Sequence, residues 1–211
     1  CADKKGPVVT EAPPKEEGRE GGDGGEDAVE EEGPEKNPFY ERSVKCPVCN
    51  TPNELRWFQG KTYSERNVDL DKHVGSYAWT EKSYEKYHPP LYYMWHCQNC
   101  HYTDAHMEFE NPAKETYSNF RFLKEVFVDS YHDDERVEKI VDKLGENIDY
   151  EKINYYQAIK LHLLAVFIQE MVEDPEEKDD FKIGRYYLRT GWLIRELNAS
   201  KDVDEKVKVT L

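Results

Sequence analysis

Two cysteine pairs of the same form constrain this chain most, because each can place two thiols on one side of a tight turn. The first pair is Cys46 and Cys49, and the second is Cys97 and Cys100. Two thiolates with this spacing can bind one metal ion at about 2.3 Å, and two such knuckles complete the tetrahedral set of zinc. The four cysteines therefore predict a structural zinc site that is closed to water and substrate. Rubredoxin-like iron is a minor alternative with the same geometry.

A histidine directly after the second pair supports a different chemistry. Cys97, Cys100 and His101 form the sequence C-x-x-C-H, in which a c-type haem bonds to both cysteines and the histidine binds its iron. The second axial ligand would then come from one of three nearby residues, Met94, Met107 or His106. Haem leaves the first pair unexplained, so we favour zinc. A third alternative is that one or both pairs form disulfides or exchange them.

The composition excludes several function classes. The 211 residues carry a formal charge of −15, with a mean hydropathy of −0.95. Binding to nucleic acid needs clustered Lys and Arg, so we expect no nucleic-acid partner. The sequence has no run of 18 apolar residues, no glycine-rich phosphate loop and no hydrolase nucleophile motif. We therefore predict that the protein is not an enzyme and has no small-molecule substrate.

The N-terminal segment predicts a lipid-anchored tether. The chain begins with Cys1, Ala2 and Asp3, which resembles the mature terminus of a bacterial lipoprotein whose first thiol carries a diacylglycerol. A truncated chain that happens to start at Cys1 is the alternative. Residues 1–37 hold seven of the 12 glycines and 12 acidic residues against five basic ones, so disorder is expected. This interpretation places the protein in a bacterial cell envelope, attached to a membrane through the lipid on Cys1.

The remaining sequence predicts an α+β fold. Short extended runs are typical of residues 38–112, which we interpret as a zinc-ribbon domain with strands at 54–58 and 91–96. A long Tyr-rich insertion occupies 60–90, so 47 residues separate the knuckles. Such an insertion is tolerated because the entropy cost of loop closure grows only with the logarithm of length.

An all-helical region is predicted at 113–200, followed by a charged tail at 201–211. Apolar residues recur with the helical period, which predicts four helices near 120–127, 137–144, 150–172 and 178–198. The second should start at Asp133 and Asp134 and end before Gly145, and the third should be the most buried. In the fourth, Gly184, Leu188 and Gly191 share one stripe, which predicts the close approach of another backbone.

Three separated segments resemble an uncharacterised bacterial family. That family pairs a CPxC knuckle, here Cys46 to Cys49, with the pattern P-L-x-Y-x-x-W-x-C-x-x-C-G-Y, here Pro90 to Tyr102. Residues 184–195 are similar to the last helix of its tetratricopeptide-like region. The chain departs from the pattern at His101, where the family has glycine, although histidine enters the left-handed region more readily than most residues. The resemblance implies a ribbon joined to paired helices, with no established activity.

Two further groups of residues have a functional and a structural interpretation. His96, His101 and His106 with Asp104 and Glu108 form a polar group that we interpret as surface residues rather than a second metal site. Tyrosines and one tryptophan in the helices suit core packing with exposed hydroxyls better than an interface patch; these are Tyr155, Tyr156, Tyr186, Tyr187 and Trp192.

The combined features predict a noncatalytic envelope protein. It would act as a scaffold or accessory subunit whose helical surface binds the other protein subunits of a larger complex. The alternatives are a mono-haem electron-transfer lipoprotein and a C-x-x-C thiol-disulfide protein. If zinc is structural, its removal is expected to unfold the ribbon before the helices.

Overall fold

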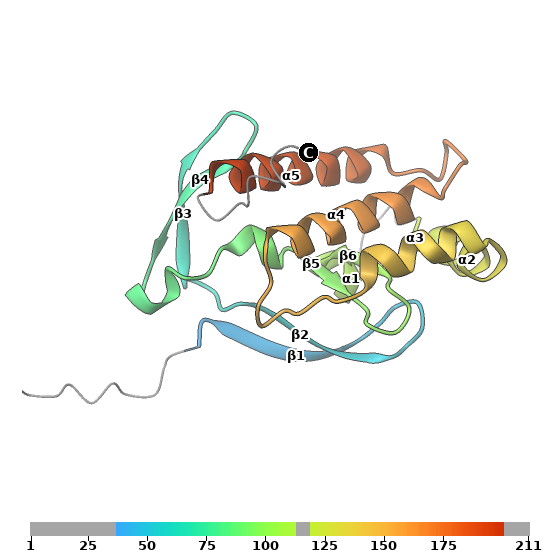
Figure 1. The fold of residues 1–211 in the computed structure, drawn as a ribbon, viewed down its shortest axis with the longest axis horizontal. Helices are drawn as coiled ribbons and strands as arrows, with labels where there is room; N and C mark the ends of the chain where they lie inside the picture. The colour runs from blue at the N-terminus through green and yellow to red at the C-terminus, as the bar shows by residue number, and fades with distance from the viewer. Residues whose placement is uncertain (1–36, 113–118, 201–211) are drawn as a thin grey trace, which may run out of the picture. The chain divides into compact units, whose positions relative to one another are not determined.

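The computed structural model describes residues 37–112 and 119–200 (Figure 1). The described residues belong to one compact unit. Its fold is α+β, with antiparallel strand pairs first and helices after them, as the sequence predicts. The expected lipidation site Cys1, nearly all of the expected tether and the expected tail at 201–211 lie outside the described residues.

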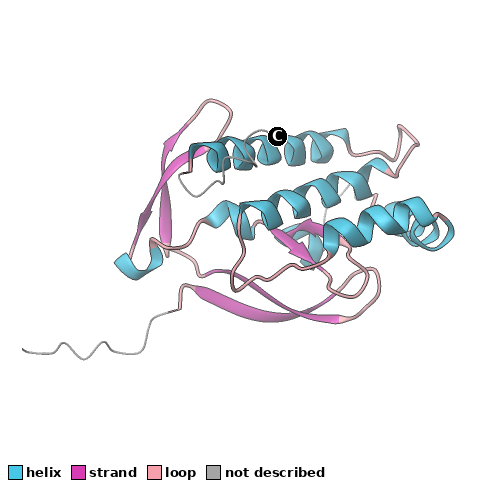
Figure 2. Cartoon of the chain, viewed as in Figure 1, coloured by secondary structure: helices cyan, strands magenta, loops and turns pink. Residues whose placement is uncertain are grey.

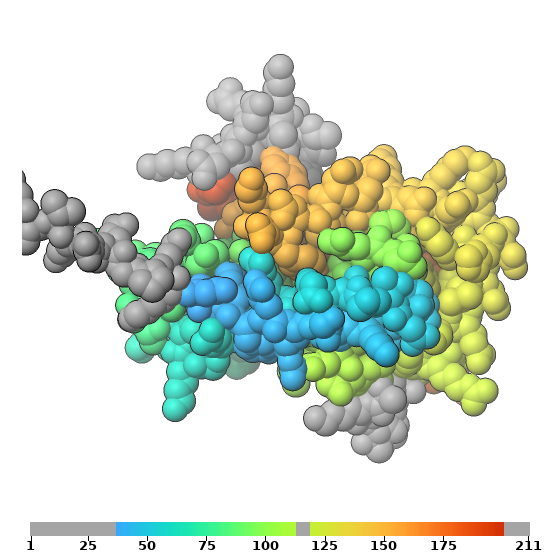
Figure 3. Space-filling view, turned by 90° about the horizontal axis from the view of Figure 1, so that it is seen from below, coloured from blue at the N-terminus to red at the C-terminus, as the bar shows by residue number. Residues whose placement is uncertain are grey.

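Three antiparallel strand pairs make up the β-structure within residues 37–112 and 119–200: β1 (Phe39–Lys45) with β2 (Pro52–Phe58), β3 (Tyr63–Val68) with β4 (Val74–Trp79), and β5 (Met94–His96) with β6 (Thr103–Ala105). Seen from below, β1 and β2 run across the middle of the molecule (Figure 3). Asn53 and Leu55 alternate inward along β2 because successive side chains of a strand face opposite sides.

The strand expected at 54–58 is confirmed within β2, whereas the one expected at 91–96 is only half right. Residues Pro89–Tyr92 form a 3-10 turn, η2, and only the last three residues are extended, as β5. The fixed backbone angle of proline suits the first positions of a helical turn, which explains the change. The insertion at 60–90, whose structure the sequence left open, contains the β3–β4 hairpin followed by another 3-10 turn, η1 (Lys82–Tyr84).

The described part of the chain continues with five α-helices, which Figure 2 shows in cyan: α1 (His106–Glu110), α2 (Phe120–Asp133), α3 (Glu135–Gly145), α4 (Tyr155–Glu170) and α5 (Asp180–Ala199). The four expected helices are confirmed, although α3 includes Gly145 rather than ending before it, and the short α1 was not expected. Asp134, Asn154 and Asp179 cap α3, α4 and α5 by accepting bonds from backbone N–H groups of the first turn. None of the described helices is long and apolar enough to cross a membrane.

One hydrophobic core joins the strands to the helices. Trp95 and Tyr102 lie in it beside the second knuckle, and Phe127 of α2 packs against Tyr102 with ring centroids 5.9 Å apart. Helix α4 is the most buried, as expected, with α5 antiparallel beside it (Figure 1). The predicted glycine stripe of α5 is wrong for the described chain: a Cβ atom at Gly184 or Gly191 would meet no described atom within 4 Å. The buried face of α5 is a different one, which carries Ile183, Tyr186, Thr190, Leu193 and Leu197.

Candidate metal centre

Each cysteine pair lies in the turn of a strand hairpin, and the two turns repeat each other bond for bond. In the first, Cys46 N–H donates to the carbonyl of Thr51 and Asn50 N–H donates to that of Cys46, both at 2.9 Å. In the second, Cys97 bonds to Tyr102 and His101 to Cys97 in the same way and at the same distances. Asn50 and His101 end the knuckles with φ of 61° and 60°, a left-handed backbone that both residue types tolerate, as expected for His101. The shared geometry turns both thiol pairs inward.

The four sulfur atoms converge on one point. All four Sγ atoms lie within 4.8 Å of one another, with Cys46 to Cys100 and Cys49 to Cys97 each at 3.6 Å. A tetrahedron with zinc–sulfur bonds of 2.3 Å has edges of about 3.8 Å, so the spacing suits such an ion. Cys46 and Cys97 are fully buried and none of the four forms a disulfide. The residues present therefore fit a closed four-thiolate metal site.

The four thiols differ in their affinity for protons. Contacts with Cys100 and Cys46 hold the pKa of Cys97 far below its usual range, whereas Cys46, Cys97 and burial raise the pKa of Cys100 far above it. Cys100 lowers the pKa of Cys46, but Cys97 and burial outweigh this and raise it to about 12. Burial raises the pKa of Cys49, but contacts with Thr51, Asn99 and Cys100 together outweigh burial and lower it. A metal ion must displace these protons, so its affinity falls as the pH falls.

Asn53 ties the two knuckles together. Its Nδ2 donates to the carbonyl of Thr51 at 2.9 Å and lies 3.6 Å from the sulfur of Cys97, while its Oδ1 accepts from Gln98 N–H at 3.1 Å. Lys124 of α2 adds a bond from Nζ to the carbonyl of Pro47 at 2.9 Å. Groups of this kind orient ligands and tune a metal site. Asn53 was not predicted as a site residue, although an amide at an inward position of a strand was the available signal.

The residues of the haem alternative are dispersed. Cys97 and Cys100 face the first cysteine pair, and His101 stacks on His96 with centroids 5.3 Å apart. The ring of His101 also packs against Gly145: a Cβ atom built on residue 145 would lie 2.4 Å from Nδ1 of His101. The proposed axial partners also point to different places: Met94 is fully buried, Met107 is exposed, and His106 stacks on Trp57 at 3.9 Å.

The polar group considered as a second metal site does not converge. Within the described residues, only the four cysteines come close enough to share an ion. The prediction that these are surface residues is nevertheless wrong for His96 and Asp104, which are each 1% exposed. His96 bonds to Thr103, and burial together with His101 lowers its pKa to about 3. It is therefore a neutral core histidine.

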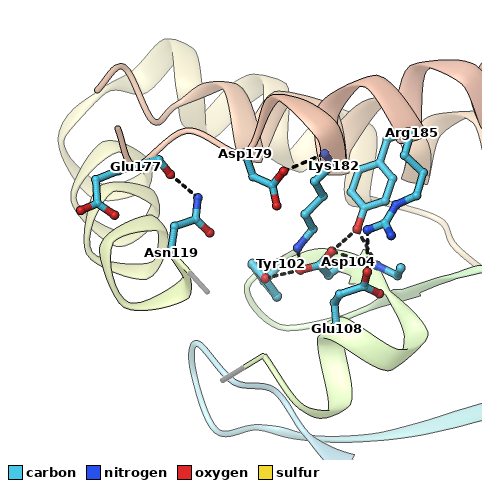
Figure 4. A network of polar contacts seen from close by, with 10 residues as sticks. Tyr102, Asp104, Glu108, Asn119, Glu177, Asp179, Lys182 and Arg185 are labelled. Atoms are coloured by element: carbon cyan, nitrogen blue, oxygen red, sulfur yellow. Dashed lines mark hydrogen bonds and ion pairs between the residues drawn. The ribbon is translucent and has the colours of Figure 1, made fainter. Parts of the chain in front are cut away.

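Asp104 is the centre of a buried polar network that joins β6 to α5 (Figure 4). Its Oδ2 accepts from the hydroxyl of Tyr102 at 2.8 Å and from Lys182 Nζ at 2.7 Å, and its Oδ1 accepts from the hydroxyl of Tyr186 and from its neighbour's N–H. Burial raises the pKa of Tyr102 and Tyr186 well above the usual value, so both hydroxyls stay protonated donors. A carboxylate with four donors is satisfied without a metal ion.

The helical tyrosines divide between core and surface. Tyr186 is fully buried, and its hydroxyl lies inside the network rather than in solvent, which corrects the expectation. Tyr156 and Tyr187 are more than 40% exposed. These two side chains, rather than the whole set, are available on the surface of α4 and α5.

Fold and site together define an α+β protein with a ribbon-like four-cysteine centre built into a helical core. The chain belongs to the DUF2225 family of uncharacterised proteins conserved in bacteria, whose model matches residues 39–210. Neither a curated protein nor a solved structure matches the chain.

Proposed function

We propose that this chain is a noncatalytic scaffold or accessory protein whose four cysteines hold one structural zinc ion. The observation that carries the proposal is the matched pair of knuckles, which brings four largely buried sulfur atoms within 4.8 Å. Four thiolates fill a tetrahedral zinc site, so no position stays open for water or substrate. Bound zinc supplies folding energy by cross-linking β1–β2 to β5–β6.

The zinc proposal is tested by metal content in cysteine variants of the full chain. We expect one zinc per chain in the parent, and loss of zinc in both Cys46→Ser and Cys97→Ser, since each removes a ligand of one shared site. Cys1→Ser is the matched control and should retain zinc fully. A Soret band with covalently bound haem that only Cys97→Ser abolishes would support the haem alternative instead. A metal-free chain with oxidised pairs would support the thiol-disulfide alternative.

The scaffold role is supported by how the helices pack. Consecutive helices contact one another from α2 to α5, an arrangement compatible with tetratricopeptide-like pairs that leave one face for a partner. Leu163 of α4 and Leu188 of α5 are apolar but 38% and 45% exposed. We expect Leu188→Glu to abolish in-cell cross-links to partner subunits, while Leu70→Glu on the exposed turn of the hairpin preserves them. Equal cross-linking by both variants would argue against a helical docking face.

Anchoring in a bacterial envelope through a lipid on Cys1 is the last component of the proposal. It rests on the sequence around that residue alone. Mass spectrometry of the N-terminal peptide from native cells tests it directly. A diacylated cysteine is expected, and an unmodified thiol would contradict the anchor without affecting the zinc proposal.

A further inference from the structure

A cavity of about 290 Å³ lies between the β3–β4 hairpin, η2 and the last turns of α5. Its size is close to the lower end of small-molecule pockets, which hold about 300 to 1,000 Å³. Five aromatic side chains from separate parts of the chain supply much of its lining: Trp57, Tyr63, Tyr77, Tyr93 and Trp192. Flat apolar walls of this kind suit a ligand with a ring.

The cavity is held open by polar contacts between the hairpin and α5. His73 Nε2 bonds to Glu196 Oε1 at 2.7 Å, and Trp192 Nε1 donates to Asp71 Oδ2 at 3.0 Å. Arg195 lies 3.7 Å from Asp71 and from Asp69. Because these bonds fix the hairpin against the helix, the walls are formed before any ligand arrives. The Tyr-rich insertion thereby acquires a role as one wall of the cavity.

Arg189 is the principal charged group in the cavity without an ionic partner. Its guanidinium lies 3.6 Å from the ring centre of Tyr93 and 5.4 Å from that of Trp192. Among the described residues it forms no ion pair, and its buried Nε has no hydrogen-bond partner. Stacking on a ring leaves the N–H edge of a guanidinium free to bind a carboxylate with two parallel bonds.

Two carboxylates line the cavity, and neither neutralises Arg189: one is bonded to histidines and the other is exposed to solvent. Glu196 accepts from His73 at 2.7 Å and from His88 at 2.6 Å. Burial alone would raise the pKa of Glu196, but the imidazoles of His88 and His73 outweigh burial and lower it. The carboxylate therefore stays ionised, and both of its oxygens are bonded to these imidazoles. Glu65 also lines the cavity but is exposed to solvent. The charge left for a ligand to neutralise is therefore positive.

A second buried polar atom without a partner belongs to the same lining. His106 Nδ1 has no hydrogen-bond partner within the described residues, and burial lowers the pKa of this ring, so it is neutral. Buried polar atoms without partners are rare in folded proteins and call for an explanation. A ligand that forms hydrogen bonds with both Arg189 and His106 would explain why these two atoms have no partner in the protein.

We propose that this cavity binds a small aromatic carboxylate, with the carboxylate on Arg189 and the ring between the tyrosine and tryptophan walls. An amine or quaternary ammonium is disfavoured because Arg189 already occupies the face of Tyr93. The inference goes beyond a structural zinc ion and a scaffold, and neither depends on it. The proposed ligand site is lined in part by residues of α4 and α5, the helices proposed to dock a partner.

The test uses the zinc-loaded full chain labelled with ¹⁵N and three probes of equal size: 1-naphthoate, 1-naphthamide and 1-naphthylmethylamine. Naphthoate is expected to shift the indole N–H resonances of Trp57 and Trp192. The indole N–H resonance of Trp95, which is buried in the ribbon core, should stay unchanged. Naphthamide and the amine should bind at least about tenfold more weakly, since they lack the charge-assisted bonds. Equal affinity of the acid and the amide overturns the proposal, as does the absence of shifts at millimolar naphthoate.

Variants locate the anion contact. Arg189→Gln should weaken naphthoate binding by about tenfold to a hundredfold, and Arg189→Lys should weaken it less because a charge remains. Arg121→Gln, an exposed arginine on α2, is the matched control and should bind as the parent does. Zinc content and the Trp95 resonance report whether each variant is folded. Unchanged affinity in a folded Arg189→Gln protein overturns the proposal.

Discussion

His101 and Gly145 form a tight contact that gives the glycine a steric role. His101 ends the second knuckle with φ of 60°, and its ring fills the space where a Cβ atom of residue 145 would lie. The nearest ring atom is 2.4 Å from that position, and the Cβ of His101 itself is at 2.7 Å, so rotation of the ring cannot relieve the clash. The end of α3 can therefore pack this closely on the second knuckle only because residue 145 has no side chain.

Gly145→Ala should destabilise the protein by about 1 to 3 kcal/mol, the usual cost of overpacking. In a His101→Gly background the clash is gone, and the same change should stabilise by about 0.5 to 1 kcal/mol because alanine favours a helix. Urea unfolding of the four zinc-loaded proteins measures this coupling. Gly184→Ala on the open surface of α5 is the control and should stabilise by a similar amount. Additive effects at residues 101 and 145 would show that the contact does not exist.

His162 contributes a pH dependence to stability. It is fully buried in α4, where it bonds to the carbonyl of Ala158, and burial lowers its pKa to about 4. The unfolded chain, with a histidine pKa of about 6.5, takes up this proton first. The stabilisation is therefore complete above pH 6.5 and is lost as the pH falls towards 4, by on the order of 3 kcal/mol.

His162→Phe keeps the ring stack on Tyr93 but cannot bind a proton, so its unfolding free energy should fall less between pH 6.5 and 4 than that of the parent. Chemical unfolding at several pH values gives the difference. His132→Gln, an exposed histidine on α2, should keep the dependence of the parent. Parallel curves for parent and His162→Phe would refute the assignment.

At the scale of elements, local sequence patterns predicted the helices better than the strands. Helices α2, α3 and α5 carry apolar residues at the helical period, and the acidic residues Asp134 and Asp179 cap α3 and α5. Both signals act within a few residues. Helix α1 is too short to show a period. The β3–β4 hairpin is mostly exposed, so it lacks the alternation of buried residues that marks a strand. Its fold depends on contacts with α5, which no local pattern records.

The link between β6 and α5 depends on a buried ion pair. Lys182 is 11% and Asp104 is 1% exposed, so removal of one charge leaves the other unpaired inside the protein. Asp104→Asn should cost about 3 to 5 kcal/mol in unfolding free energy. Glu135→Gln breaks the exposed pair with Lys139 on α3 and should cost less than about 0.5 kcal/mol. Urea unfolding measures both, and equal costs would mean that the network does not hold the two elements together.

At the scale of the whole molecule, the sequence revealed the cysteines of the centre but not its supports. Cysteine spacing is a local signal for a chemistry that few other residues perform. Asn53 and Lys124 reach the knuckles from β2 and α2, and polar residues of these types are common everywhere on a surface. The aromatic cavity was missed for the same reason, since Trp57, Tyr77 and Arg189 meet only in the folded chain.

The shared core changes the expected response to metal removal. Tyr102 follows the second knuckle and packs on Phe127 of α2, while the hydroxyl of Tyr150 donates to the carbonyl of Met94 at 2.7 Å. A ribbon that loosened alone would expose the apolar faces of α2 and α4 that it covers. The sequence predicted that the ribbon unfolds before the helices, whereas these contacts indicate that both unfold together.

Chelation of zinc from the full chain should therefore lower one common unfolding transition. Tryptophan fluorescence reports mainly on the ribbon and hairpin, which hold Trp57, Trp79 and Trp95, and circular dichroism at 222 nm reports on the helices. Both midpoints should fall together by roughly 10 °C or more, because about 1 kcal/mol corresponds to 2–4 °C in a domain of this size and a structural zinc contributes several. The Cys1→Ser protein should behave as the parent. If fluorescence melted first while the circular dichroism transition stayed in place, ribbon and helices would be independent units, as the sequence alone suggests.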